Sequence, residues 1–271
     1  MNFFVLQGVI ELKESHPIDE DVKSKINIFL DRFYTNRIGI RVLINQHILL
    51  YGSQLTNHPH HVGCIDPNCD VVEVVKDAFE KAKFLCEQYY LISPDVDIIT
   101  HNPYEMNRPI NIVYVPSHLY HILFEVLKNA MRAVVETHSK ETEVPKIKVL
   151  ICKGQKDLTI KVSDQGGGVP YNKVHKLFEY MYSTAPTPNW KGDGTAPLAG
   201  YGYGLPLSRI YARYFKGDLV LSSVEGYGTD AFVYLKVLSN EANECIPVYN
   251  KTSSKMYDTH ISASDWTQTK R

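Results

Sequence analysis

The sequence predicts an α+β protein, in which a partial all-α helical-bundle segment is followed by an α/β sandwich with a mixed sheet. Two observations carry this prediction. Helical periodicity dominates the first half of the chain, and short alternating apolar and polar segments gather from residue 147 onward. Helices followed by mixed strands are typical of a helical segment joined to a sandwich. The 271 residues, 44% of them hydrophobic and 22% charged, are ordinary for globular domains.

Composition argues against several classes of protein. The formal net charge is −1, so no basic field is available to hold nucleic acid. We expect no membrane span, because no apolar run approaches about 18 residues. The five cysteines are scattered, which argues against a disulfide framework. The first residues look like neither a signal peptide nor an Arg-rich transit peptide, so we expect a targeting segment to be absent or to lie upstream.

The first predicted helix spans residues 19–51. Asp19 or Asp21 could cap its start. A helix of this length is not stable alone, and few partners lie upstream, which suggests an incomplete bundle. Its apolar residues fall largely on one stripe at helical spacing: Ile26, Phe29, Leu30, Phe33, Ile40, Leu43, Ile44 and Leu50.

The middle of the chain contains two further helices. Residues 52–69 are rich in Gly, Pro, Asn and His and are expected to form a loop. An amphipathic helix is predicted from Val71 to Tyr90 and a short strand from Ile110 to Val115. Pro116 and Ser117 then open a helix from His118 to about Thr137, with Ser117 as a plausible N-cap.

The second half alternates strands with short helices. Two antiparallel strands are predicted at 146–152 and 158–163, joined by a turn at 154–157. A second hairpin is expected at 218–223 and 229–237, with its turn at 225–228. The remaining expectations are helices at 174–181 and 205–215, a Pro-, Gly- and Thr-rich stretch at 183–200, and a polar tail from residue 239.

The helix at 118–137 carries an unusual set of polar side chains. His121, Glu125, Asn129 and Arg132 are spaced four, four and three residues apart, so they share one face, and Lys128 sits beside them. Such a stripe is unsuited to a core. The alternative is an ordinary solvated face of a surface helix.

A glycine-rich segment follows the strand at 158–163. Asp164 is followed after Gln165 by Gly166, Gly167 and Gly168, and three glycines in a row suggest that something approaches the backbone closely. An aspartate here can accept a hydrogen bond from an exocyclic amine such as that of adenine. The alternative is a glycine-rich hairpin turn.

A second glycine motif, Gly200-Tyr-Gly-Tyr-Gly-Leu-Pro206, opens the helix at 205–215. Glycines before a helix N-terminus present bare N–H groups and a positive dipole to phosphate. A run of this kind is weak evidence alone. The chain lacks the phosphate-binding Gly-x-x-x-x-Gly-Lys-Ser/Thr loop and the signature motifs of ordinary protein kinases.

Taken in order, the three motifs resemble the nucleotide-binding boxes of the GHKL (Bergerat-type) fold, shared by histidine kinases, Hsp90-type chaperones and MutL-type repair proteins. Within that superfamily the chain resembles the mitochondrial α-keto acid dehydrogenase kinases. Its sequence segments are more similar to those of the pyruvate dehydrogenase kinases than to those of the branched-chain enzyme. The resemblance runs from about Gln7 to Trp266. It rests on segments 29–38, 115–121, 125–133, 181–188, 197–206 and 226–231. Family members extend further upstream, so the chain looks N-terminally truncated.

The resemblance implies roles for these residues. Glu125 would be the general base, with His121 hydrogen-bonded to it, and Asn129 would ligate Mg²⁺. The implied cofactors are ATP and Mg²⁺, with K⁺ as an additional candidate. Residues 183–199 would form a lid over ATP. The remaining implied nucleotide-binding residues are Lys128, Arg132, Asp164, Gly166, Gly168, Ser183, Thr184, Leu198, Gly200, Tyr201, Gly202, Tyr203, Gly204, Leu205 and Thr229.

The resemblance also implies a domain organisation. Residues 1–59 would be the remnant of a regulatory helical bundle, 60–240 the ATP-binding kinase domain, and 241–271 a C-terminal tail. Arg37 and Arg41 match positions that bind pyruvate-like carboxylates, although exposed helix arginines are an equal alternative. Asp265 and Trp266 match a motif that docks on the other subunit of a homodimer.

The function implied is that of a mitochondrial-matrix protein serine kinase. It would phosphorylate, and so inhibit, the E1 alpha subunit of the pyruvate dehydrogenase complex, with the E2 lipoyl domain as a second partner. One alternative is a histidine-kinase-like enzyme, but His47 lacks the surroundings of a phospho-acceptor. The other is a catalytically impaired ATP-binding regulatory fragment. A zinc site at His58, His60, His61, Cys64 and Cys69 is disfavoured, because the spacing fits no standard ligand pattern.

Overall fold

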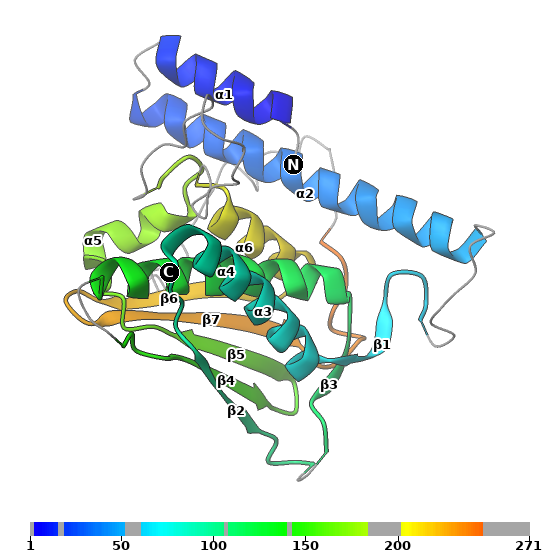
Figure 1. Cartoon of the computed structure of the whole chain (residues 1–271). Helices are drawn as coiled ribbons and strands as arrows, with labels where there is room; N and C mark the ends of the chain where they lie inside the picture. Colours follow the sequence, from blue (N-terminus) through cyan, green and yellow to red (C-terminus); the bar gives the residue numbers. More distant parts are fainter. Residues whose placement is uncertain are drawn as a thin grey trace, which may run out of the picture.

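A five-stranded mixed sheet covered on one face by helices forms the centre of the molecule (Figure 1). The computed structural model describes residues 3–15, 19–51, 61–105, 108–139, 143–183 and 202–245. The strand order is β2-β4-β5-β7-β6, in which only the β2–β4 pair is parallel. The strands are β2 (Val96–His101), β4 (Ile147–Lys153), β5 (Asp157–Ser163), β6 (Asp218–Val224) and β7 (Gly228–Lys236).

Each central strand has one face that is buried under the helices and one face that points outward. Alternate residues point to the helices and are fully or nearly fully buried, as period-two patterning requires. These residues are Ile147, Val149, Ile151, Leu158, Ile160, Val162, Ala231, Val233 and Leu235. The two predicted hairpins are therefore confirmed, including the first turn, where Gly154 N–H donates to the carbonyl of Asp157 at 2.9 Å.

Helices α3 (Val71–Tyr90), α4 (Pro116–Thr137) and α6 (Gly204–Tyr214) form the layer over the sheet. Asp70 caps α3 by accepting from the backbone N–H groups of Val72 and Glu73. The N-cap prediction for Ser117 is wrong. The N-cap of α4 is Val115, because Pro116, whose φ is already helical, occupies the first helical position and starts the helix earlier.

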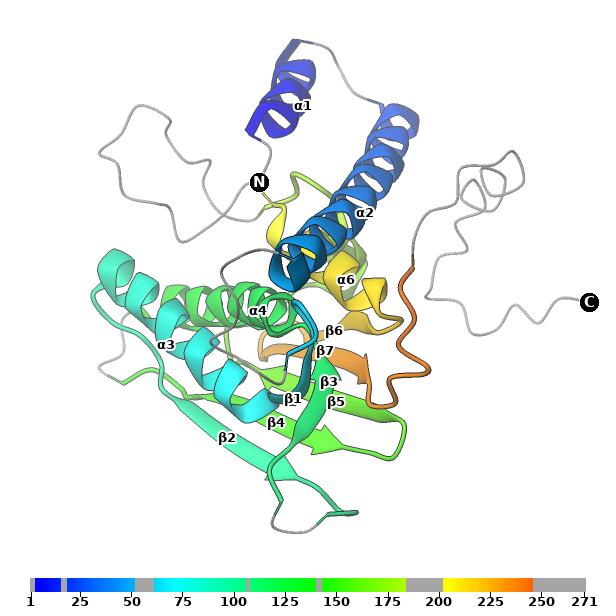
Figure 2. The ribbon, with the colours of Figure 1, turned by 90° about the vertical axis from the view of Figure 1, so that its right-hand side faces the viewer.

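Helix α2 (Glu20–Tyr51) lies across the helical layer on the side away from the sheet, with α1 (Phe3–Ser15) near its start (Figures 1 and 2). Asp19 caps α2, because its Oδ1 accepts from Val22 N–H at 2.8 Å. The single apolar stripe is corrected. The side chains buried on α2 are Leu30, Tyr34, Ile38 and Val42, whereas Phe29, Ile40, Leu43, Ile44 and Leu50 are exposed.

Polar contacts fix α2 to the segment that follows α5. The Lys23 ammonium lies 2.6 Å from the Glu179 carboxylate, and the Asn27 side chain accepts from Tyr180 N–H at 3.2 Å. The Tyr180 hydroxyl donates to Asp31 at 2.8 Å. The long helix is therefore held to the sandwich as well as packed against it.

Several elements differ from the sequence prediction. The predicted loop at 52–69 ends in a strand, β1 (Asp66–Asp70), which pairs with β3 (Asn111–Tyr114). The helix predicted at 174–181 begins earlier, as α5 (Tyr171–Val174) and a 3-10 turn (His175–Phe178). The helical conformation ends at Phe178, because the backbone of Glu179 is extended, with φ −83° and ψ 137°. Sequence reasoning assigned neither α1 nor β2.

In the described part of the chain, no helix is long and apolar enough to cross a membrane. Asp265 and Trp266, which the resemblance assigns to a homodimer contact, lie outside the described residues.

Candidate functional site

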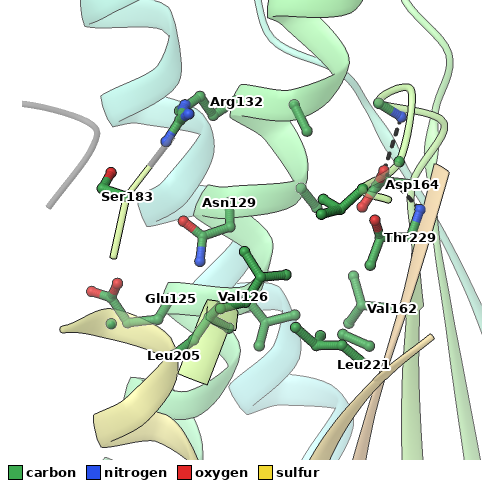
Figure 3. Close-up of a pocket in the computed structure, with 18 of the residues that line it drawn as sticks. Glu125, Val126, Asn129, Arg132, Val162, Asp164, Ser183, Leu205, Leu221 and Thr229 are labelled. Atoms are coloured by element: carbon green, nitrogen blue, oxygen red, sulfur yellow. Dashed lines mark hydrogen bonds between the residues drawn. The ribbon is translucent and has the colours of Figure 1, made fainter. Parts of the chain in front are cut away.

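A cavity of about 330 Å³ lies between α4, the start of α6 and the strands β5, β6 and β7 (Figure 3). It receives most of the residues singled out from the sequence. The predicted residues that line it are Glu125, Asn129, Arg132, Asp164, Gly166, Gly168, Ser183, Gly202, Gly204, Leu205 and Thr229. Residues from three separate motifs thus meet around one hollow.

Helix α4 supplies one polar wall. Glu125, Asn129 and Arg132 follow one another along its cavity-facing side, as their spacing predicted (Figure 3). The opposite side of α4 packs into the core with Leu119, Leu127 and Met131, which are fully buried. The polar face is therefore not solvated surface but the wall of a pocket.

Glu125 sits at a crowded position. Its carboxylate pairs with the Lys128 ammonium, 2.9 Å away, and both side chains are largely buried. A Cβ atom added at Gly204 would lie 2.2 Å from Glu125 Oε2. A side chain at the first residue of α6 would therefore displace this carboxylate from its present position.

The hydrogen bond expected between His121 and Glu125 is not formed. His121 Nε2 is buried without a partner in the described residues, and the ring packs on Tyr211 with centroids 4.8 Å apart. The Lys128 ammonium donates to the Glu125 carboxylate instead. Lys128 lies three positions further along the helix, and its long side chain reaches the carboxylate directly. Burial lowers the pKa of the His121 imidazole, so the ring is neutral at neutral pH.

Asp164 lies at the other end of the cavity, where β5 leads into the glycine segment. Its Oδ1 accepts from Gly166 N–H at 2.8 Å and from Thr229 N–H at 3.2 Å. Burial raises the pKa of Asp164 to about 6, against the opposing effect of these two donors. Since both bonds go to Oδ1, the second oxygen is left to meet a ligand.

The glycines of this segment are required by the protein's own backbone. Gly168 has φ +66°, and a Cβ there would lie 2.1 Å from the carbonyl oxygen of Val224. A Cβ at Gly166 would lie 2.4 Å from that of Ala133 on α4. The segment is thus pressed between α4 and the β6–β7 hairpin, which brings Asp164 to the cavity.

The floor of the cavity is apolar and was not predicted. It is formed by residues whose type gave no functional signal, such as Val126, Val162 and Leu221 (Figure 3). The alternation of the strands could have placed Val162 and Leu221 on the inner face, but not under a ligand. An apolar floor with a few polar groups at its rim is typical of small-molecule sites.

Arg132 is held at the cavity rim by a short chain of bonds. Its Nε donates to Glu136 Oε1 at 3.0 Å, and the same oxygen accepts from the Tyr90 hydroxyl of α3 at 2.7 Å. Glu136 also lines the cavity. Neither Glu136 nor Tyr90 was identified from the sequence.

A second cavity, of about 310 Å³, lies on the other side of Glu125, between α2, α4 and α6. It is lined by the described residues of the predicted site that do not line the first cavity. These are Arg37, Arg41, His121, Lys128 and Tyr203, and Glu125 and Gly204 line both cavities. Arg37 and Arg41 also border a wide open groove of about 820 Å³ along α2.

Some predicted site residues lie outside the described part of the chain. These are Thr184, Leu198, Gly200 and Tyr201, with most of the predicted lid, and His58 and His60 of the disfavoured zinc site. Among the described residues, no cluster of three or more His, Cys, Asp or Glu side chains is suited to a metal ion.

Comparison with known proteins identifies the family. Residues 114–239 match the model of histidine kinase-, DNA gyrase B- and HSP90-like ATPases, and residues 4–66 match that of mitochondrial branched-chain alpha-ketoacid dehydrogenase kinase. The chain is 57% identical over 263 residues to mitochondrial pyruvate dehydrogenase (acetyl-transferring) kinase isozyme 3 of Mus musculus. The chain belongs to the pyruvate dehydrogenase kinase family.

Two further members of the pyruvate dehydrogenase kinase family show the same extent of similarity. The Drosophila melanogaster kinase is 56% identical over 266 residues, and isozyme 4 of Homo sapiens is 54% identical over 260 residues. These matches cover 96% of this chain but only 63–64% of those proteins. The chain thus spans a little under two thirds of the length of the relatives, and it includes an ATPase-type domain.

Proposed function

We propose that this chain is a mitochondrial protein serine kinase that transfers the γ-phosphoryl group of ATP to the E1 alpha subunit of the pyruvate dehydrogenase complex and so inhibits it. The observation that carries the proposal is the position of Glu125, a carboxylate at the inner end of a nucleotide-sized cavity. The relatives are named as pyruvate dehydrogenase kinases and as mitochondrial, which supports the substrate and the organelle. The matrix is the compartment we propose.

The cavity residues fit an adenine nucleotide. The second oxygen of Asp164 suits an exocyclic amine, and the apolar floor of Val126, Val162 and Leu221 suits the face of a base. Gly202 and Gly204 place bare backbone at the start of α6, where helical N–H groups favour phosphate. When bound, ATP supplies the phosphoryl group.

Asn129 lies between Glu125 and Arg132 on the wall of α4 (Figure 3). Its side-chain carbonyl is a hard oxygen ligand of the kind that Mg²⁺ prefers, and Mg²⁺ offsets the charge of the phosphates. We therefore propose Asn129 as the magnesium ligand. The Arg132 guanidinium, oriented by Glu136, lies at the same rim, where it can meet a phosphate.

Glu125 is the proposed base. Its carboxylate accepts the proton of the substrate serine hydroxyl as the oxygen attacks phosphorus, while Lys128 holds the carboxylate in place. His121 lies one helical turn before Glu125 as a neutral ring that packs on Tyr211. Transfer of this type depends on positioning and on charge neutralisation, both of which these side chains provide.

The direct test is transfer of labelled phosphate from Mg-ATP to purified pyruvate dehydrogenase E1, followed by acid treatment. The proposal predicts acid-stable label on a serine of E1. Acid-labile label on this chain would favour a histidine-kinase-like enzyme. Bound ATP without transfer would leave a nucleotide-binding regulatory fragment, and the kinase proposal would be wrong.

A further inference from the structure

The orientation of Arg132 depends on Glu136, which follows it on the same helix. Arg132 lies on the α4 wall of the first cavity, three residues beyond Asn129 (Figure 3). Its Nε donates to Glu136 Oε1 at 3.0 Å, and its side chain is only 14% exposed. The guanidinium is planar, so a bond at Nε fixes the plane in which the terminal nitrogens lie. The direction in which Arg132 can meet a phosphate therefore depends on where Glu136 lies.

The pair of Arg132 and Glu136 is too weak to hold one geometry by itself. The two residues are four positions apart on one helix, and the Glu136 side chain is 42% exposed. Ion pairs of this kind stabilise a helix little, because water screens them and two long side chains must be ordered. A further contact to Glu136 is needed to fix the arginine.

Tyr90 of α3 supplies that contact. Its hydroxyl donates to the same oxygen, Glu136 Oε1, at 2.7 Å. The ring is partly buried against the core and meets Tyr89 edge-on, with centroids 4.9 Å apart. Burial and the bond to Glu136 raise the pKa of the Tyr90 hydroxyl, which stays a donor at neutral pH. A tyrosine has only two rotatable side-chain bonds, so it fixes Glu136 at a low cost in entropy.

The position of Tyr90 is itself fixed by the end of α3. Tyr90 is the last residue of this helix, and Leu91 follows with φ 62° and donates its N–H to the Glu87 carbonyl at 2.9 Å. Helix α3 packs on α4, with Ala82 and Cys86 fully buried. The chain of bonds from Tyr90 to Arg132 therefore starts from a fixed point of the fold.

We propose that Tyr90 is a positioning residue for phosphate binding, which acts through Glu136 to direct the Arg132 guanidinium towards the phosphates of ATP. This inference rests on the proposed function and deepens it. None of the residues of α3 lines the cavity, so Tyr90 would affect the nucleotide without touching it. The effect should be confined to ligands that carry phosphate, because Arg132 is the group that Tyr90 orients.

The test compares Tyr90→Phe with the unaltered full chain in nucleotide binding. Affinities for ATP, ADP and adenosine are measured by competition with labelled ADP in the presence of Mg²⁺. Loss of one hydrogen bond to a charged group should weaken the binding of ATP and ADP about three- to tenfold. Adenosine has no phosphate for Arg132 to meet, so its affinity should stay within about twofold. A purely structural role of Tyr90 would weaken all three ligands alike.

Two further variants separate positioning from packing. Tyr89→Phe is the matched control, because Tyr89 is the neighbouring tyrosine and is 53% exposed. It should bind all three ligands as the unaltered chain does. Arg132→Gln should weaken ATP binding at least as much as Tyr90→Phe. If Tyr90 acts through Arg132, adding Tyr90→Phe to Arg132→Gln should cause no further loss.

Three outcomes overturn the inference. In the first, Tyr90→Phe binds ATP and ADP as tightly as the unaltered chain. In the second, the losses caused by Tyr90→Phe and Arg132→Gln multiply in the double variant. In the third, adenosine loses as much affinity as ATP. Absence of phosphate transfer to E1 while the predicted affinities hold would count against the kinase proposal alone, because binding is measured without E1.

Discussion

Asp164 shows how one buried carboxylate acquires a property that its sequence motif does not reveal. The motif predicted a hydrogen-bond acceptor for adenine, and the structure adds the two backbone donors and the burial that raises the pKa to about 6. Burial has the larger effect, although the donors oppose it. The protonation state of Asp164, the proposed adenine contact, is therefore sensitive to pH.

Nucleotide affinity is predicted to fall as the pH drops below about 6. A carboxylate accepts from an exocyclic amine, whereas a protonated oxygen does so poorly, so binding favours the ionised form. Affinity at pH 5 should be roughly tenfold weaker than at pH 7. Titration calorimetry of ADP across this range tests it, with Asp164→Asn as the control, because the amide has no ionisable proton. An equal pH profile in both proteins would contradict this account.

The same shift has a consequence for stability. The folded-state pKa lies above the ordinary value of 3.8, so between pH 3.8 and about 6 the folded protein binds more protons at Asp164 than the unfolded chain does. The contribution of Asp164 to the free energy of unfolding therefore decreases as the pH rises through this window. The Asp164→Asn substitution removes this pH-dependent contribution, because an amide does not ionise, which makes it the matching variant for the stability measurement.

The surroundings of Glu125 could be predicted from the sequence only in part. Spacing on α4 placed Glu125, Asn129 and Arg132 correctly on one wall. It could not show that Lys128 and not His121 contacts Glu125, because this depends on the packing of the His121 ring against Tyr211 of α6. The spacing of residues within one helix cannot predict such a contact between two elements that are far apart in the chain.

At the scale of the elements, the glycine segment after β5 and the β6–β7 turn form a matched pair of positions. Gly168 and Gly226 both have positive φ, of +66° and +82°. A Cβ at Gly168 would meet the Val224 carbonyl oxygen at 2.1 Å, whereas at Gly226 nothing lies within 4 Å. An alanine at Gly226 would therefore cause only backbone strain, whereas an alanine at Gly168 would also overlap with neighbouring atoms.

Gly168→Ala is predicted to destabilise the fold by more than Gly226→Ala. The latter should cost about 1 kcal/mol for the left-handed conformation alone. Gly168→Ala adds the displacement of the hairpin backbone and should also weaken nucleotide binding, because Gly168 lines the cavity. Thermal unfolding and ADP affinity measure the two effects. If the melting temperature fell equally in both variants, Gly168 would not be packed closely against the carbonyl of Val224.

The elements that the sequence did not reveal share a physical cause. Strand β2 lies at the edge of the sheet with most side chains exposed, so its residues have little buried face to generate alternation. Strand β1 consists of Asp-Pro-Asn-Cys-Asp, a poor strand former, and exists because β3 pairs with it. By contrast, α3 and both central hairpins bury one clear face and were predicted closely.

At the scale of the whole molecule, α2 packs on the sandwich through one of its faces. Leu30 is fully buried, whereas its neighbour Phe29, on a different face of the same helix, is 55% exposed. The apolar residues of α2 thus divide between two faces, which a single predicted stripe could not distinguish. The division into domains at residues 59 and 240 remains a prediction.

Leu30→Ala and Phe29→Ala are predicted to differ clearly in the free energy of unfolding. Deleting the Leu30 side chain leaves a cavity between α2 and the core and should cost about 2–5 kcal/mol. Phe29→Ala removes only a half-exposed ring, which stacks on Phe33, and should cost less than about 1 kcal/mol. Urea unfolding of both variants provides the measurement. Similar losses in the two would mean that α2 does not pack through this face.

The measurement that tests the central claim most directly compares the Glu125→Gln variant with the unaltered chain in two assays, phosphate transfer to pyruvate dehydrogenase E1 and ATP affinity. Loss of the base should lower the transfer rate about 10²- to 10⁴-fold. ATP affinity should stay within about threefold, since glutamine keeps the shape of the site and Asn129 and Asp164 are untouched. Transfer at the original rate in Glu125→Gln would contradict the assignment of Glu125 as the base.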